Sequence, residues 1–363
     1  QVLLAAAGGA DSVAEIQALV TDGNDAIDYL TTTVQALTTA PAAGSVGAGE
    51  ISVDDQLAAY AAAGVTGVSA GNLLAVNAQL RLETTATNKD SVSEIQTIVA
   101  KADTALGYLA TVAAETEAPQ SVVGSGISEV DQLAAYAAAG VTGVTADNLL
   151  AVNAQMRVAS SISTVAQVQA VVAQANIEIG QIEFFADGDT ALSDTDYSDV
   201  GVTGVTADNL LAVNAQVLLA SDGAANSVLE IQDIVADADA ALAYILSDIA
   251  PLIATDVVAV GDQLAAYAAV GVTGVSADNL LAVNAQIRKQ FAADNGPENL
   301  DTVSDLQAKV GSANDAIAYL TTTVQPLTTA PAAGAVGSGE ISVDDQLAAY
   351  GAAGVTGVSA DNL

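Results

Sequence analysis

The residues with the clearest potential for chemistry lie in the acidic stretch DGDTALSDTDYSDVG at 187–201. Its clustered aspartates are Asp187, Asp189, Asp194, Asp196 and Asp199. Clustered carboxylates can bind calcium, which takes roughly six to eight oxygen ligands. The spacing of an EF-hand loop and its terminal glutamate are missing, so the sequence favours the alternative, a solvated acidic loop. Calcium is the one cofactor that the sequence suggests, and no other cofactor is expected.

A second candidate is the glycine-rich pentapeptide GVTGV, which recurs along the chain. It stands at 64–68, 140–144, 201–205, 271–275 and 354–358, each time followed by Ser or Thr. A phosphate-binding loop would need a preceding strand and a lysine, and neither is present. The other interpretation is a helix end, a tight turn and a helix start, because glycine adopts the left-handed conformation that closes helices. We expect this second role.

Residue types that enzymes commonly use are missing. The chain has no cysteine and no histidine. Thiolate nucleophiles, disulfides, the usual zinc sites and Ser-His-Asp triads are therefore excluded. The carboxylates form no isolated acid pair beside an aromatic platform, so we do not expect an enzyme.

The charge balance limits the partners. The net charge is −36, from 43 acidic and 7 basic residues. Such a surface repels nucleic acid and anionic membranes. The sequence also contains no apolar run of about 18 residues, so we expect no membrane insertion in this segment. A strongly acidic surface is typical of a salt-rich, exposed environment.

A long helix is predicted at the start of each of five repeated segments. Each segment opens with Ser or Thr followed three residues later by an acid or amide, the pattern of a capping box. The pairs are Ser12/Glu15, Ser91/Glu94, Thr164/Gln167, Ser227/Glu230 and Thr302/Asp305. Apolar residues follow with gaps of three and four, which predicts an amphipathic helix of about 20 residues.

Two shorter helices are predicted behind each long one. The segment DQLAAYAAAG at 55–64 gives a second helix that ends at Gly64. The segment SAGNLLAVNAQLR at 69–81 gives a third helix, which we expect Ser69 to cap. Asparagines on its apolar face are expected to be buried and hydrogen-bonded. These are Asn77, Asn153, Asn214 and Asn284.

Tyrosines recur at two fixed positions, and core packing is the expected role of both sets. One set is Tyr60, Tyr136, Tyr197, Tyr267 and Tyr350; the other is Tyr29, Tyr108, Tyr244 and Tyr319.

These segments predict an all-α fold, an elongated tandem array of three-helix repeats. The predicted boundaries are 1–11, the tail of a preceding repeat; 12–90, repeat 1; 91–163, repeat 2; 164–226, repeat 3, with a variant acidic second helix; 227–301, repeat 4; and 302–363, repeat 5, with an incomplete third helix. The chain thus begins and ends inside a repeat, and we expect head-to-tail self-association with neighbouring repeats or chains.

The motif QLAAYAAAGVTGV-[ST]-ADNLLAVNAQ, preceded by a capped SVxEIQxIV helix, resembles the GA-module-like repeats of large bacterial cell-surface proteins of the adhesin type. The resemblance covers essentially the whole chain and implies three-helix units in long surface arrays. Some GA modules bind serum albumin. The second helix here is mostly alanine with one tyrosine, and the net charge of the chain is strongly negative, so we do not infer albumin binding from the resemblance.

We therefore expect a structural or adhesive segment of a long extracellular, cell-surface protein, which forms or extends a filament or stalk by stacking its repeats. The alternative is an array of ligand-binding modules of the albumin-binding type, which predicts one exposed apolar patch recurring in every repeat. An enzyme would instead have a unique polar pocket in one repeat. The host or cell-surface ligand is not specified by the sequence.

Overall fold

The computed structural model describes residues 10–42, 45–113, 127–159, 162–186, 189–220, 223–249, 258–294, 302–328, 331–332, 336–337 and 340–363. In this described part the regular structure is entirely helical, with fourteen α-helices and no strand. The all-α prediction is confirmed for these residues. Residues 1–9, most of the expected tail of a preceding repeat, lie outside them.

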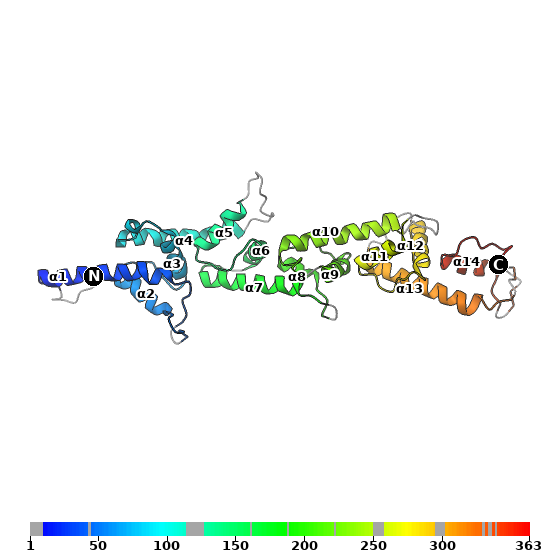
Figure 1. The fold of residues 1–363 in the computed structure, drawn as a ribbon, viewed down its shortest axis with the longest axis horizontal. Helices are drawn as coiled ribbons and strands as arrows, with labels where there is room; N and C mark the ends of the chain where they lie inside the picture. Colours follow the sequence, from blue (N-terminus) through cyan, green and yellow to red (C-terminus); the bar gives the residue numbers. More distant parts are fainter. Residues whose placement is uncertain are drawn as a thin grey trace. The chain divides into compact units, whose positions relative to one another are not determined.

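The chain forms two compact units, which are described separately. Unit 1 comprises residues 1–180 and 199–201. Its helices are α1 (Val13–Thr32), the 3-10 turn η2 (Val34–Ala36), α2 (Val53–Ala62), α3 (Leu73–Leu82), the 3-10 turn η3 (Ala86–Asn88), α4 (Val92–Ala113), α5 (Glu129–Ala138), α6 (Leu149–Val158) and most of α7 (Val165–Glu183). Along the chain, the long helix α1 is followed by the short helices α2 and α3, and α4 is followed by α5 and α6 (Figure 1).

Unit 2 comprises residues 181–198 and 202–363. Its helices are most of α8 (Asp194–Asp199), α9 (Leu210–Leu219), α10 (Val228–Tyr244) with a π-helical turn η4 (Ile245–Ile249), α11 (Val260–Ala269), α12 (Leu280–Asp294), α13 (Val303–Tyr319) with a π-helical turn η5 (Leu320–Val324), and α14 (Val343–Ala352). None of the helices within the described ranges is long and apolar enough to cross a membrane.

The five long helices begin where the capping pattern predicts. In all five, the hydroxyl oxygen of the predicted Ser or Thr accepts from the backbone N–H three residues on, at 3.1–3.4 Å. In α1 the return bond from Ser12 N–H to Glu15 completes the capping box at 2.8 Å. The cap satisfies backbone donors that the first helical turn leaves free.

The third helices begin later than predicted. Ser69 does not cap α3; its own N–H donates to the Asn72 side chain at 2.8 Å, and Asn72 occupies the N-cap position. The Asn72 side chain is turned toward the preceding loop, where its Nδ2 also donates to the carbonyl of Gly67 at 2.9 Å. The asparagine therefore stabilises the GVTGV turn rather than the helix end.

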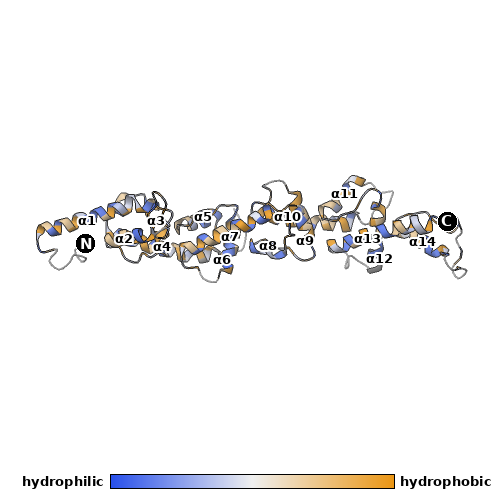
Figure 2. Ribbon diagram, turned by 90° about the horizontal axis from the view of Figure 1, so that it is seen from below, coloured by the Kyte–Doolittle hydropathy of each residue, from blue (hydrophilic) through white to orange (hydrophobic). Residues whose placement is uncertain are grey.

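Hydrophobic and hydrophilic residues are interspersed along the helices (Figure 2). In unit 1, α4 contacts α3 before it and α5 and α6 after it; in unit 2, α10 contacts α9 and α11, and α13 contacts α12 and α14. These three long helices thus each pack on the third helix of the preceding repeat and on the second helix of their own repeat. The small inner residues Ala102, Ala175, Ala238 and Ala313 are fully buried, which allows close helix approach.

Candidate functional site

The acidic cluster of repeat 3 is engaged in local capping where it is described. Asp196 accepts from the Ser193 N–H and hydroxyl, both at 2.7 Å, and the Ser193 hydroxyl accepts from the Asp196 N–H at 3.4 Å, so the pair caps the start of α8. Asp189 accepts from the Ala186 N–H at 3.0 Å. Asp194 and Asp199 lie at the two ends of α8, and Asp187 lies outside the described residues.

The described residues contain no group of three or more acidic side chains placed to hold a metal ion. Because Asp187 is not among them, calcium binding stays a prediction from the sequence.

The most extensive recurring polar arrangement joins consecutive repeats. In four of the five repeats, a glutamine of the long helix forms paired bonds with the threonine of the preceding GVTGV turn. In repeat 2, Gln96 accepts from the Thr66 N–H at 3.0 Å and donates to the Thr66 carbonyl at 2.8 Å. We call these residues the clamp glutamine and the turn threonine. The other pairs are Gln169/Thr142, Gln232/Thr203 and Gln307/Thr273.

A second bond fixes the register of the same contact. The side chain of the turn asparagine Asn72 donates to Asp103 of α4 at 2.7 Å. The same bond recurs at 2.7 Å in the pairs Asn148/Asn176, Asn209/Asp239 and Asn279/Asn314. Glutamine and partner lie seven residues apart on the long helix, so both face the turn.

The two glycines of GVTGV have separate roles here, and both have positive φ. A Cβ built on the second glycine would meet a long-helix valine at ordinary contact distance: for Gly143, Val172 at 3.7 Å. In the four turns from Gly140 onward, the first glycine lies against the third helix of the preceding repeat. A Cβ on Gly140 would lie 2.6 Å from the Leu74 carbonyl carbon and 2.8 Å from the Ala75 nitrogen. Position 140 therefore requires glycine because of the limited space as well as the backbone conformation.

A glutamine of the third helix completes the contact. Gln79 of α3 donates to the carbonyl of Ala138, near the end of α5 in the next repeat, at 2.8 Å. The corresponding bonds are Gln155 to Asp199, Gln216 to Ala269 and Gln286 to Ala352. Together these contacts make up what we call the joint: the turn and third helix of one repeat held against the long and second helices of the next.

Inside repeats 1 to 4, a buried side-chain network ties the second helix to the third. In repeat 2, the Tyr136 hydroxyl donates to Asn153 Oδ1 at 2.7 Å, and Asn153 Nδ2 donates to Gln132 at 2.8 Å. Gln132 in turn donates to the Ile127 carbonyl at 2.8 Å. The prediction that the third-helix asparagines are buried and hydrogen-bonded is confirmed.

Repeat 3 retains this network in a shorter form. Ser193, which directly precedes α8, stands at the position of the glutamine, and Asn214 Nδ2 donates directly to the Leu192 carbonyl at 2.9 Å. The Tyr197 hydroxyl still donates to Asn214 at 2.7 Å. The acidic second helix is thus accommodated without leaving the asparagine unpaired.

Burial changes the chemistry of the network tyrosines. Loss of hydration raises the pKa of the phenols of Tyr60, Tyr136, Tyr197 and Tyr267 well above the ordinary value. Nearby arginines oppose this effect weakly in three of them, and Asp196 adds to it in Tyr197. These phenols are therefore neutral structural donors at physiological pH.

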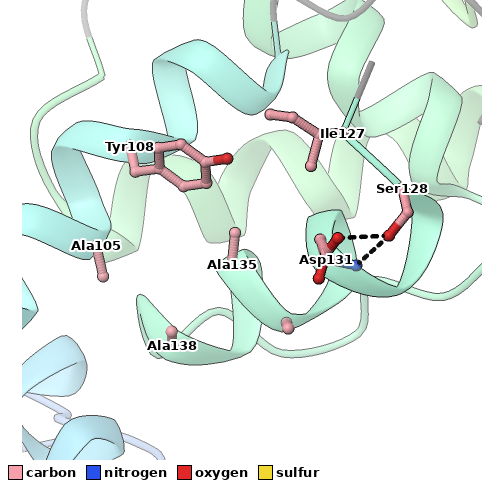
Figure 3. Close-up of a pocket in the computed structure, with 8 residues that line it drawn as sticks. Ala105, Tyr108, Ile127, Ser128, Asp131, Ala135 and Ala138 are labelled. Carbon is pink, nitrogen blue, oxygen red and sulfur yellow. Dashed lines mark hydrogen bonds between the residues drawn. The ribbon is translucent and has the colours of Figure 1, made fainter. Parts of the chain in front are cut away.

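The second tyrosine set differs from its prediction. Tyr29, Tyr108, Tyr244 and Tyr319 are each about 40% exposed, so core packing is the wrong role for them. Tyr108 of α4 lies across from Ala135 of α5 in an open pocket of about 580 Å³ (Figure 3). The pocket wall also includes Ser128 and Asp131, which are hydrogen-bonded to each other and cap α5.

The sequence alone did not predict the residues of the joint. The clamp glutamine stands five residues after each capping Ser or Thr, within EIQ, VQ or LQ, and this constant spacing was the available signal. Its partner lies 27 to 34 residues away, so only the fold reveals the pair.

Comparisons with known proteins give no relative. No protein-family model, no curated protein and no solved structure matches this chain.

Proposed function

We propose that the chain is a structural or adhesive segment of a long extracellular repeat protein. In this proposal each repeat is a three-helix module, and the modules stack head to tail into a surface filament or stalk. The observation that supports the proposal is the joint. It forms between residues at equivalent positions of consecutive repeats, with the same bond from the turn threonine to the clamp glutamine, at four successive places in the chain.

The chemistry of the joint suits a mechanical role. Its hydrogen bonds use backbone groups, amides and short side chains that fix one geometry, and its glycines allow close backbone approach. Repetition of one geometry gives each module the same relation to its neighbour. No disulfide is needed for this, because the chain has no cysteine and packing carries the contact. The strongly acidic surface supports an exposed location and disfavours nucleic acid as a partner.

We predict that Gln232→Ala lowers the free energy of unfolding by about 1–2 kcal/mol, because it removes three bonds to partly hydrated groups of Thr203. Gln17→Ala is the matched control. Gln17 holds the same position on α1, and its side-chain amide has no hydrogen-bond partner in the described residues. Urea unfolding of both variants measures the difference. Equal midpoints for the two would contradict a stabilising role for the joint.

The second candidate function, an array of ligand-binding modules, is favoured by the half-exposed tyrosines. Four of the five repeats carry one at the same position, and repeat 3 has Gln181 instead. The pocket at Tyr108 would then be the ligand site. Calorimetric titration with serum albumin tests this candidate: binding whose stoichiometry falls by one site in Tyr108→Ala would establish it, whereas a structural array predicts no heat of binding.

A further inference from the structure

A half-exposed tyrosine lines a groove that no described segment of the chain fills. Tyr108 of α4 is 42% exposed, and its ring lies across from Ala135 of α5 (Figure 3). Its hydroxyl bonds to no described residue and points toward the end of the groove formed by Ile127 and Asp131 (Figure 3). A phenol ring with this much of its surface in water can contact a ligand with both its apolar face and its polar tip.

The exposure belongs to the repeat and not to its place in the chain. The equivalent residues Tyr29, Tyr244 and Tyr319 are each 40% exposed. Repeats 2 and 4 are each preceded and followed by another repeat, and their tyrosines are as exposed as those of repeats 1 and 5. The linker after α1 is described at 33–42 and 45–52, and Tyr29 is exposed with this linker in place. Neither an adjacent repeat nor the linker therefore covers this position.

The groove beside Tyr108 combines an apolar floor with one negative charge. Besides Tyr108, it is lined by Ile127, Ser128, Asp131, Ala105, Ala134, Ala135 and Ala138, and we call it the tyrosine groove. Asp131 is the one charged residue in this lining. Its Oδ2 accepts from the Ser128 hydroxyl at 2.6 Å, and its Oδ1 has no partner among the described residues. The short alanine side chains leave space for a long, unbranched side chain whose charged end reaches Asp131.

The same lining residues occur wherever the tyrosine does. The counterparts of Ala105 and Asp131 are Ala26 and Asp55 in repeat 1, Ala241 and Asp262 in repeat 4, and Ala316 and Asp345 in repeat 5. Repeat 3 differs, because Glu178 and Gln181 replace the alanine and the tyrosine. Glu178 is engaged by the amide of Gln174 at 2.7 Å. The tyrosine, the alanine floor and the aspartate are therefore kept together in four repeats and lost together in one.

We propose that the tyrosine groove binds lysine side chains of a basic partner protein. The lysine stem lies over the alanine floor, and its ammonium group lies between the ring face of Tyr108 and Oδ1 of Asp131. The ring face of a tyrosine attracts a cation electrostatically. Lysine fits this geometry better than arginine, because an ammonium group needs only the one free carboxylate oxygen, whereas a guanidinium pairs with two.

Charge complementarity identifies the occupant as a basic partner. The chain carries a net charge of −36, which attracts a cationic protein and repels a second, equally acidic copy. Lys101 lines a separate pocket that shares Tyr108, and it is paired with Glu83 at 4.0 Å, which offsets its charge. The inference does not rest on the joint. Of the groove residues only Ala138 takes part in the joint, through its backbone carbonyl.

An NMR titration of the 363-residue chain with a decalysine peptide, acetylated and amidated at its ends, tests the proposal. The Cδ1 methyl signal of Ile127 reports on the groove, and that of the fully buried Ile95 is the internal control. At about 0.15 M salt, charges more than about 8 Å away are largely screened. We expect the Ile127 signal to shift and saturate with decalysine but not with a Gly-Ser peptide of equal length, while the Ile95 signal stays in place.

Two pairs of variants separate binding in the groove from general attraction to the acidic surface. Tyr108→Leu keeps the net charge and should weaken the Ile127 titration roughly two- to fivefold, whereas Tyr108→Phe keeps the ring face and should leave it unchanged. Asp131→Asn should weaken the titration by a similar factor. Asp147→Asn removes the same charge from an exposed position outside the groove and should have no effect. An unchanged Ile95 signal in each variant shows that the fold is kept.

Three results would overturn the proposal. The Ile127 signal does not move with decalysine; Tyr108→Leu binds the peptide as tightly as its parent, which would assign binding to the acidic surface in general; or the Ile127 signal shifts with protein concentration alone, which would assign the groove to a second copy. Failure here is separable from failure of the proposed function. Gln232→Ala reports on the joint, so its effect would persist if the groove bound no lysine.

Discussion

Gly140→Ala is expected to destabilise unit 1 by about 2–4 kcal/mol. The left-handed backbone at φ +76° accounts for roughly 1–2 kcal/mol of this, because alanine is strained there. The remainder comes from the new methyl group, which meets the backbone of α3 at Leu74 and Ala75. A helix backbone cannot yield as a flexible side chain does, so α3 and the turn must separate.

Gly64→Ala is the matched control for this prediction. Gly64 has nearly the same conformation, with φ +82°, but no described atom lies near its Cβ position. It should lose only the conformational part, about 1–2 kcal/mol. Thermal or urea unfolding of the two variants gives the difference. If Gly64→Ala costs as much as Gly140→Ala, the close approach of turn and third helix does not hold the repeats together.

Alkaline pH is expected to unfold both units. Burial raises the pKa of the network tyrosines, so the unfolded chain loses its phenolic protons first, near pH 10. Their stabilising contribution is fully present below that pH and is lost as the pH rises toward the folded-state pKa. Each buried tyrosine should remove about 1.4 kcal/mol of unfolding free energy per pH unit above about pH 10.

Urea unfolding at intervals between pH 9 and pH 11.5 measures this slope. Tyr136→Phe provides the comparison, because it removes one titrating group and leaves Asn153 with one bond fewer. This variant should be less stable than its parent at neutral pH but should lose stability less steeply with pH. Parallel slopes for the two proteins would show that Tyr136 titrates normally in the folded chain.

The local features of the fold were predictable from sequence because their causes are local. Capping pairs such as Ser91 and Glu94 are three residues apart and form within one helical turn. The GVTGV turn follows from glycine conformation, and Gly64 and Gly67 both have positive φ as a helix end and turn require. The burial of Asn77 followed from its place on the apolar face of α3.

The partners of these features were not predictable. Periodicity shows that α4 has an apolar face but not that the third helix of the previous repeat covers part of it. The start of α3 was misplaced because Asn72 bonds back to the turn, a preference that competes with capping by Ser69. Tyr108 was assigned to the core because its ring is apolar, but α5 leaves one side of it open.

Hydrogen exchange of the turn-threonine amides tests the joint most directly. The N–H groups of Thr142, Thr203 and Thr273 donate to clamp glutamines at 2.8–3.1 Å. The N–H of Thr356 has no such acceptor among the described residues. We expect the amides of Thr142, Thr203 and Thr273 to exchange at least tenfold more slowly than that of Thr356, because each of the three exchanges only when its joint opens. Equal exchange rates at all four amides would contradict it.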